Sequence, residues 1–281
     1  IARRKMGLHW RRLLTLGVLA VGVPLIVGCG KYEKILKGTD AELQYKMALE
    51  YYKKGKYSKA QSLFERCVPV YRVTQRADSL GYYLSDCYFH TSSYVLAGFS
   101  FDQLVQNYPR SPFAEDAEFM SAYCLYKASP RPELDQEYTL KAIAGFEHFV
   151  EQHPMSTRTP EANTLLKELY GKLLTKSYNG AYQYYWQRNY RAAVAALQQS
   201  LLDYPITPYR EEQMYLLTKS AYLLAVNSVE SKQRTRYQNA VDHYLSFISE
   251  FPNSKHRNEV SQYYVRAVKA LGETPNPELI R

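Results

Sequence analysis

The sequence lacks every motif that indicates a common catalytic or nucleotide-binding site. It contains no GxxxxGK(S/T) phosphate-binding loop, no GxGxxG turn after a strand, no GxSxG nucleophile turn and no HExxH pair. Acid pairs such as Glu115 with Asp116 stand where helices are expected to begin, and there they complement the helix dipole. We therefore expect a protein that is not an enzyme and needs no cofactor for chemistry.

Cysteine is scarce, and its pattern argues against a metal site. After Cys29 only Cys67, Cys87 and Cys124 remain, an odd number with no CxxC spacing and no histidine at ligand spacing. Each lies in a helical pattern beside small or aromatic residues. We expect three small, buried, apolar side chains, and one disulfide among them stays open as an alternative in an oxidising compartment.

Acidic residues are absent from the first 28 positions, which hold five of the 36 basic residues. The five precede the apolar run of residues 13–27, which is the layout of a secretory signal peptide. As a helix this run would extend about 22 Å, short of the ~30 Å hydrocarbon core of a membrane. It ends at Gly28 and Cys29, a pattern that resembles the bacterial lipobox. We expect a lipoprotein signal peptide over residues 1–28, a diacylglycerol and an acyl chain on Cys29, and a lipidated tether over residues 29–39.

Removal of the signal peptide leaves little net charge. The rest of the chain has 31 basic and 27 acidic residues, so the calculated pI of about 9.1 overstates its basicity. A mildly basic, solvated surface is more consistent with this balance than a nucleic-acid footprint. We expect no nucleic-acid partner.

Strand-type alternation is also missing, and helical periodicity dominates from Asp40 onward. Five aligned small residues reveal an internal repeat: Ala60, Ala97, Ala142, Ala193 and Ala240. Four residues after each comes a large side chain: Phe64, Phe101, Phe146, Leu197 and Tyr244. Twelve residues after the last four alanines comes a proline, preceded by an aromatic residue or histidine.

Each copy of the repeat predicts two antiparallel helices. Small residues let the two backbones approach, and the large side chain fills the groove beside them. The proline ends the second helix, and a hydroxyl residue two positions later is expected to cap the next helix. The capping residues would be Ser111, Ser156, Thr207 and Ser254. The pattern resembles the tetratricopeptide repeat (TPR), so the predicted fold class is all-α, an α-solenoid of about five TPR-like helix pairs with a C-terminal capping helix.

The spacings between the aligned alanines are 37, 45, 51 and 47 residues, so the later copies need longer helices or loops than a 34-residue repeat. We expect the solenoid over residues 40–271, with halves of about 40–154 and 155–271. Loops are expected over residues 129–133 and 227–235, and the capping helix within residues 254–271. Residues 272–281 are expected to form a flexible tail.

The chain resembles the BamD family of outer-membrane assembly lipoproteins. The resemblance rests on the lipobox cysteine, the five copies and two phrases, YYKKGKY at residues 51–57 and YPRSPFAEDA at residues 108–117. It implies a lipid-anchored subunit of the β-barrel assembly machine, on the periplasmic side of the outer membrane. The implied partners are a BamA-like barrel subunit, other subunits of that machine and unfolded outer-membrane proteins. Gly30 and Lys31, without an acid, resemble signals that permit outer-membrane sorting.

Two groups of site residues are predicted. Client peptides would bind the A-helix positions that face the groove in TPR proteins: Tyr45, Leu49, Tyr52, Tyr82, Phe89, Phe119, Tyr123 and Tyr126. The alternative for these aromatic residues is packing between neighbouring repeats. The barrel subunit would dock on exposed cations of the later copies: Arg188, Arg191, Arg210, Lys255, Arg257 and Arg266.

Other functions stay open at this level. Another TPR lipoprotein, such as a pilotin or an adaptor of the peptidoglycan machinery, is the main alternative to a subunit of the assembly machine. A peptidoglycan-associated enzyme is a third.

Overall fold

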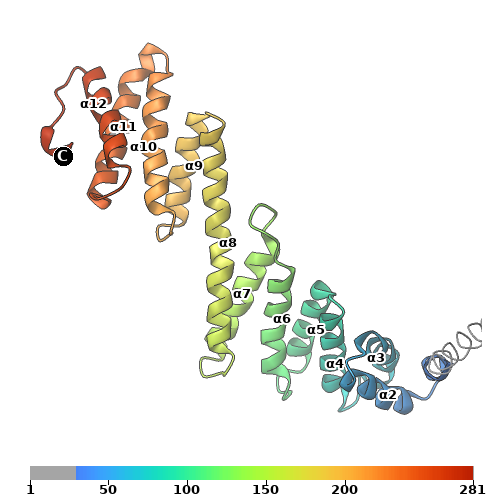
Figure 1. The fold of residues 1–281 in the computed structure, drawn as a ribbon. Coiled ribbons are helices and arrows are strands. Elements are labelled where there is room, and N and C mark those ends of the chain that lie inside the picture. The colour runs from blue at the N-terminus through green and yellow to red at the C-terminus, as the bar shows by residue number, and fades with distance from the viewer. Residues whose placement is uncertain (1–29, 281) are drawn as a thin grey trace, which may run out of the picture. The chain divides into compact units, whose positions relative to one another are not determined.

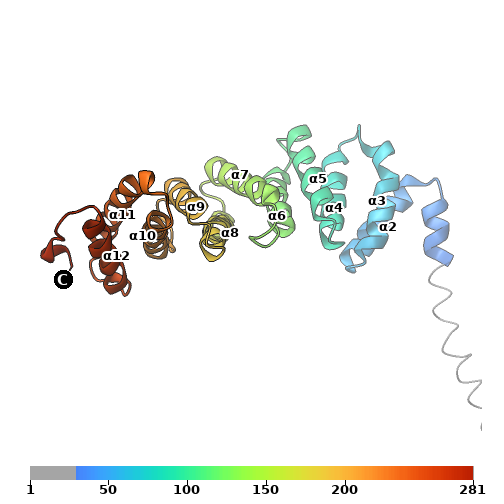
Figure 2. The ribbon, with the colours of Figure 1, turned by 90° about the horizontal axis from the view of Figure 1, so that it is seen from above.

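The computed structural model describes residues 30–280, and these residues form helices joined by turns, with no strand among them (Figures 1 and 2). Residues 30–37 are helical and precede the first of the repeats. The remaining helices are α2 (Ala41–Lys53), α3 (Tyr57–Tyr71), α4 (Ala77–His90), α5 (Tyr94–Asn107), α6 (Ala114–Ala128), α7 (Glu137–Gln152), α8 (Thr159–Trp186), α9 (Tyr190–Asp203), α10 (Arg210–Val226), α11 (Glu230–Glu250), α12 (Arg257–Ala270) and the short η1 (Pro277–Leu279). The predicted all-α architecture is confirmed for this range.

The chain divides into two compact units. Among the described residues, the first contains 30–129 and 141–163, and the second contains 130–140 and 164–280. In the first unit α2 packs on α3, α3 on α4, α4 on α5 and α5 on α6; in the second, α9 packs on α10, α10 on α11 and α11 on α12. We call the first helix of each pair the A helix (α2, α4, α6, α8 and α10) and the second the B helix. The predicted boundary near residue 154 stays a prediction.

The repeat positions build the core of each pair. The five aligned alanines are at most 4% exposed, and the five large side chains four residues later are fully buried. Close backbone approach is most evident at Gly145, where an added Cβ would lie 2.9 Å from the Cβ of Ala122. The predicted helix pairing through small residues is therefore confirmed.

The proline pattern also marks helix ends. α5, α7, α9 and α11 each end one residue before the aromatic residue or histidine that precedes the proline. The expected capping by hydroxyl residues is wrong for α6, α10 and α12, which begin without a side-chain cap. The hydroxyl residues instead stabilise the preceding turn, where each accepts a hydrogen bond from the backbone amide two residues later. Ser111 thus accepts from the Phe113 amide at 3.2 Å, and Ser254 from the His256 amide at 3.0 Å.

Three expectations need correction. The predicted loop over residues 227–235 is only the turn 227–229, because α11 already begins at Glu230. The tether expected after Cys29 is a helix over residues 30–37 whose Tyr32 and Ile35 are buried in the first core. The tail expected to be flexible packs back on α11 and α12, where the Tyr244 hydroxyl donates to the Leu279 carbonyl at 2.5 Å.

The three cysteines of the described range are free and buried, as expected for small core side chains. Burial raises the pKa of the Cys67 thiol to about 11 and those of Cys87 and Cys124 to about 12. None of the described helices is long and apolar enough to cross a membrane. The predicted signal peptide and Cys29 lie outside the described residues.

Candidate protein-binding surface

One aromatic position recurs on every A helix and lies at the junction to the next repeat. It holds Tyr45, Tyr82, Phe119, Tyr178 and Tyr215, which we call the first row. A side chain that directly precedes the next A helix, or α12 after the last pair, lies over each of these rings. The covering residues are Arg76, Phe113, Arg158, Tyr209 and His256.

The covering contacts are close, although their chemistry differs. The Phe113 ring stacks on Tyr82 with centroids 4.8 Å apart, and the Arg158 guanidinium lies 4.4 Å from the Phe119 ring. In the second unit, Tyr209 stacks on Tyr178 at 4.5 Å and His256 on Tyr215 at 3.8 Å. The covering position is therefore always occupied by a flat group, either an aromatic ring or a guanidinium. The first-row rings serve packing between successive repeats.

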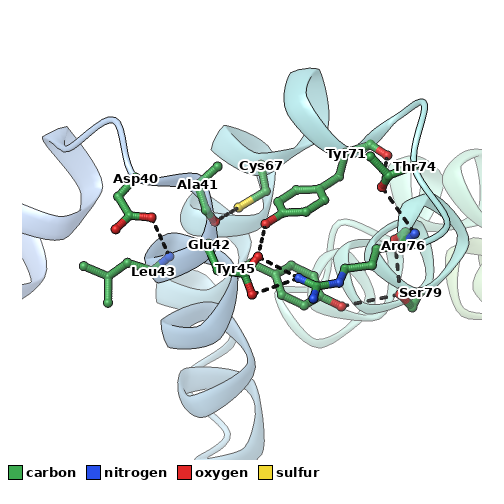
Figure 3. Close-up of polar contacts among 10 residues, drawn as sticks. All are labelled: Asp40, Ala41, Glu42, Leu43, Tyr45, Cys67, Tyr71, Thr74, Arg76 and Ser79. Atoms are coloured by element: carbon green, nitrogen blue, oxygen red, sulfur yellow. Dashed lines mark hydrogen bonds and ion pairs between the residues drawn. The ribbon is translucent and has the colours of Figure 1, made fainter.

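A carboxylate completes the first junction (Figure 3). Glu42 accepts from the Tyr71 hydroxyl at 2.7 Å and from Nη1 of Arg76 at 2.9 and 2.7 Å. Those hydrogen bonds lower the pKa of Glu42, the bond from Tyr71 contributing most. The Tyr45 hydroxyl lies 3.4 Å from the Ser79 hydroxyl. The ring of Tyr45 thus contacts Arg76 and Tyr71, and its hydroxyl lies beside Ser79, so the residue is engaged by the protein itself.

A similar acid serves the junction between α4 and α6. The Tyr82 hydroxyl donates to Asp116, whose other oxygen pairs with Arg158 at 2.5 Å. Burial and the bond to Asp116 raise the pKa of Tyr82, so the phenol stays protonated. Asp116 therefore links two successive covering contacts of the first row.

A second aromatic position lies seven residues further along each A helix. It holds Tyr52, Phe89, Tyr126, Tyr185 and Tyr222, which we call the second row, and all five are half-buried. Phe89 lies 5.7 Å from the ring of Tyr123, which in turn stacks on Tyr126 at 5.7 Å. These three rings form a partly exposed aromatic strip that crosses from α4 to α6. Tyr52 instead donates to Asp86 at 2.7 Å.

The structure separates the predicted client residues into two groups. Phe119 is only 1% exposed and belongs to the core, so its assignment to an open groove was wrong, and Tyr45 is buried as well. Tyr82 is half-buried but its ring and hydroxyl are both engaged at the junction. Five predicted residues keep exposed surface on the A helices: Leu49, Tyr52, Phe89, Tyr123 and Tyr126.

Sequence reasoning missed equivalent residues on α8. Ala48 and Ala181 each lie twelve residues before an aligned alanine, Ala60 and Ala193, and the same offsets place Tyr182 and Tyr185 at the positions of Leu49 and Tyr52. Tyr182 is 39% exposed, and the nearby Trp186 is 73% exposed. The signal was therefore present in the repeat alignment, but it was applied only to the first three copies.

The predicted docking cations also separate. Arg188, Arg191, Lys255 and Arg266 are exposed. Arg210 is not free, because its Nη2 pairs with Glu250 at 2.9 Å and its Nη1 donates to the Pro205 carbonyl at 3.0 Å. Arg257 is half-buried and donates to the Pro252 carbonyl in the equivalent way. Their description as exposed was wrong, because Arg210 holds the turn between α9 and α10 and Arg257 the turn between α11 and α12.

The junction between α10 and α12 contains a compact charged cluster. Lys219 lies 2.8 Å from Glu259, which also accepts from the hydroxyls of Tyr215 at 2.9 Å and Tyr263 at 2.6 Å. Burial alone would raise the pKa of Glu259, but the bonds from Lys219 and the two tyrosines outweigh it and hold the pKa at about 2. The cluster is internally satisfied, and no group of three metal-ligating side chains exists anywhere in residues 30–280.

Comparison with known proteins gives three findings. Residues 37–181, slightly more than half of the chain, match the model of a family described as outer membrane lipoprotein (YfiO). The chain is 28% identical over 134 residues to a putative outer membrane protein assembly factor BamD of Aquifex aeolicus (strain VF5), a match that covers 47% of this chain and 44% of that protein. The chain thus matches less than half the length of this relative.

Among solved structures, a thermophilic TPR protein of Thermus thermophilus is similar. It is 16% identical in sequence, and the alignment covers 82% of this chain and 99% of that chain with a TM-score of 0.36.

Proposed function

The chain belongs to the outer membrane lipoprotein family YfiO, and from this premise we propose that it is a non-catalytic, lipid-anchored scaffold of outer-membrane protein assembly. The proposed anchor is a diacylglycerol and an acyl chain on Cys29, which would hold the protein on the periplasmic side of the outer membrane. The name of the Aquifex aeolicus relative, an assembly factor, supports this role. The proposed clients are unfolded outer-membrane proteins.

The aromatic strip carries the client-binding part of the proposal. Phe89, Tyr123 and Tyr126 are half-buried, contact one another across two A helices and keep exposed surface, unlike the buried Phe119 of the first row. Aromatic side chains give a large contact area at low entropic cost, which suits the apolar, aromatic-ended strands of outer-membrane proteins. Client contact is therefore assigned to the aromatic strip of Phe89, Tyr123 and Tyr126.

Peptide binding tests this assignment. A labelled peptide from the C-terminal strand of an outer-membrane barrel protein is titrated with the mature chain and with Phe89→Ala and Tyr123→Ala. Loss of a central aromatic contact is expected to weaken binding by about 2 kcal/mol, roughly 30-fold. Tyr184→Ala is the matched control, because Tyr184 is 42% exposed but lies outside both rows. Unchanged binding by both strip variants would contradict the assignment.

We further propose that a BamA-like barrel subunit docks on the second unit. The four exposed cations, Arg188, Arg191, Lys255 and Arg266, suit the polar rim of an interface. Truncation after Pro205 would be a poor test, since Leu197 of α9 shares one core cluster with Met214 and Leu217 of α10. Charge reversal of the four residues to Glu leaves that core intact.

Co-purification from detergent-solubilised membranes measures docking. Reversal of the four cations is expected to abolish recovery of the barrel subunit while peptide capture persists. Arg110, Lys167, Lys232 and Arg234, which are also exposed, provide a control set with the same change of charge. Continued recovery with the first set would place the docking surface elsewhere, and recovery of a peptidoglycan-machinery protein instead would favour the adaptor alternative.

A further inference from the structure

The positive charge of the mature chain is concentrated at its beginning. Residues 30–60 contain eight lysines and four acidic residues, whereas residues 61–281 contain 23 basic and 23 acidic residues. The entire excess of positive charge therefore lies within the first helical segment, α2 and the start of α3.

The helical segment 30–37 contacts both ends of α2 and the start of α3. Near its start, the Tyr32 ring lies 5.5 Å from Tyr51, and the Tyr32 hydroxyl donates to the Lys59 carbonyl at 3.3 Å. Near its end, the Gln44 amide donates to the Ile35 carbonyl at 3.1 Å. The beginning of this segment thus lies beside the turn that joins α2 to α3.

That turn and the segment bring several lysines together. Exposed ammonium groups come from the segment and from residues 53–56, and we call them the lysine end: Lys31, Lys34, Lys53, Lys54 and Lys56. Among the described residues, only Lys54 of this group pairs with an acid, Glu50 at 3.7 Å. Lys59 adds its charge beside the group, with Nζ 5.0 Å from the Tyr32 ring.

The lysine end adjoins the attachment point of the proposed anchor. Cys29 directly precedes Gly30 in the sequence, and Gly30 is already part of the helical segment 30–37. We propose that the lysine end lies against the anionic phospholipid headgroups of the membrane that holds the lipid anchor. The inference rests on the proposed anchor at Cys29. Attraction to anionic lipids increases with each lysine near the surface and is screened by salt.

The first test measures vesicle binding without the covalent lipid. The mature chain with Cys29→Ser is mixed with phosphatidylcholine vesicles that contain or lack phosphatidylglycerol, at low and at high salt. We expect binding only to the anionic vesicles and only at low salt. Replacement of the five residues of the lysine end by Gln is expected to weaken this binding at least tenfold, because each lysine near the surface contributes separately to the attraction.

A matched variant controls for net charge. Arg110, Lys167, Lys232, Arg234 and Lys269 are exposed outside the lysine end, and their replacement by Gln removes the same charge. This variant is expected to bind the anionic vesicles almost as well as the parent. Equal losses in the two variants, or no binding by the parent, would overturn the proposal. Peptide capture is measured on the same samples, so that failure here is distinguishable from failure of the proposed client binding.

The second test uses the lipidated chain in vesicles that contain phosphatidylglycerol. An amine-reactive reagent that does not cross membranes is applied, and labelling is quantified by mass spectrometry. In the vesicle-bound, lipidated chain we expect Lys31, Lys53 and Lys56 to be labelled several-fold less than in the Cys29→Ser chain in detergent-free solution. The labelling of Lys167 and Lys232 is expected to be the same in both samples. Equal labelling of both groups in both samples would show that the lysine end faces solvent and would contradict the proposal.

Discussion

The two rows of aromatic side chains occupy the same A helices, seven residues apart, yet they serve different purposes. First-row rings each lie under a flat group from the turn before the next A helix or before α12, as Phe119 lies under Arg158. Second-row rings such as Phe89 lie beyond the reach of that turn and keep exposed surface. Both rows hold aromatic residues, so residue type does not explain why one row is covered and the other keeps exposed surface. The distance of each ring from the turn that begins the next repeat decides whether it stabilises the fold or remains available for binding.

Phe119→Ala should give the largest loss of stability. The Phe119 ring is 1% exposed and packs against Phe146 at 5.5 Å and Phe149 at 5.4 Å. Truncation of such a buried ring leaves a cavity and is expected to cost about 3–5 kcal/mol of unfolding free energy. Chemical denaturation measures this change. Trp186→Ala, which removes a side chain that is 73% exposed, is the control and should change stability by less than ~0.5 kcal/mol.

Arg158→Gln tests the covering group itself. It removes the ion pair with Asp116 at 2.5 Å and the cation above the Phe119 ring at 4.4 Å, and it leaves the ring in place. The expected loss of unfolding free energy is about 1–2 kcal/mol, since both groups are about one-third exposed. Arg110→Gln, at an exposed site, provides the comparison. Equal stability of the two variants would mean that the covering contact adds nothing to the junction.

Glu259→Gln probes the last junction through its pH dependence. The folded pKa of Glu259, about 2, lies below the ordinary value of 4.5, so the stabilisation is complete above about pH 4.5 and is lost as the pH falls towards 2. The carboxylate is 41% exposed, so solvent screening reduces the effect to about 1 kcal/mol at pH 7. Denaturation at several pH values should show the difference between variant and parent shrinking below pH 4.5. A difference that stays constant down to pH 2 would rule out the charge of Glu259 as its source.

Phe89→Ala should destabilise the fold much less than Phe119→Ala. Its ring is half-buried, so we expect a loss of about 1 kcal/mol or less, together with the roughly 30-fold weaker peptide binding proposed above. Stability and binding are measured on one preparation. A loss as large as that of Phe119→Ala would show that the second row, too, is part of the packing.

Several features of the fold could be predicted because they depend on short spacings. Ala60 with Phe64, or Ala193 with Leu197, places a small and a large side chain one turn apart on the same helix face, and these residues are buried in the structure. A proline cannot continue a helix, so the ends of α5, α7, α9 and α11 followed from the sequence. The capping helix predicted within residues 254–271 is α12, and its Val260 and Tyr264, one turn apart, are both buried.

The candidate site could be predicted only in part. The repeat alignment placed Tyr45, Tyr52 and Phe89 correctly on A helices, but it did not reveal which of them the next repeat would cover. The covering side chain Arg76 is 31 residues from Tyr45, and His256 is 41 residues from Tyr215. In each case a complete B helix and turns separate the ring from the side chain that covers it. A spacing rule within one helix carries no information about such contacts.

What the sequence by itself determined, then, is the order of the helices, their pairing through small residues and the concentration of positive charge before residue 61. Only the tertiary structure decided that Phe119 is buried, that Arg210 and Arg257 bind the carbonyls of Pro205 and Pro252, and that the lysine end gathers beside Gly30. The physical reason is range. Helix formation and pairing are governed by residues a few positions apart, whereas burial of a particular side chain depends on which distant segment packs over it.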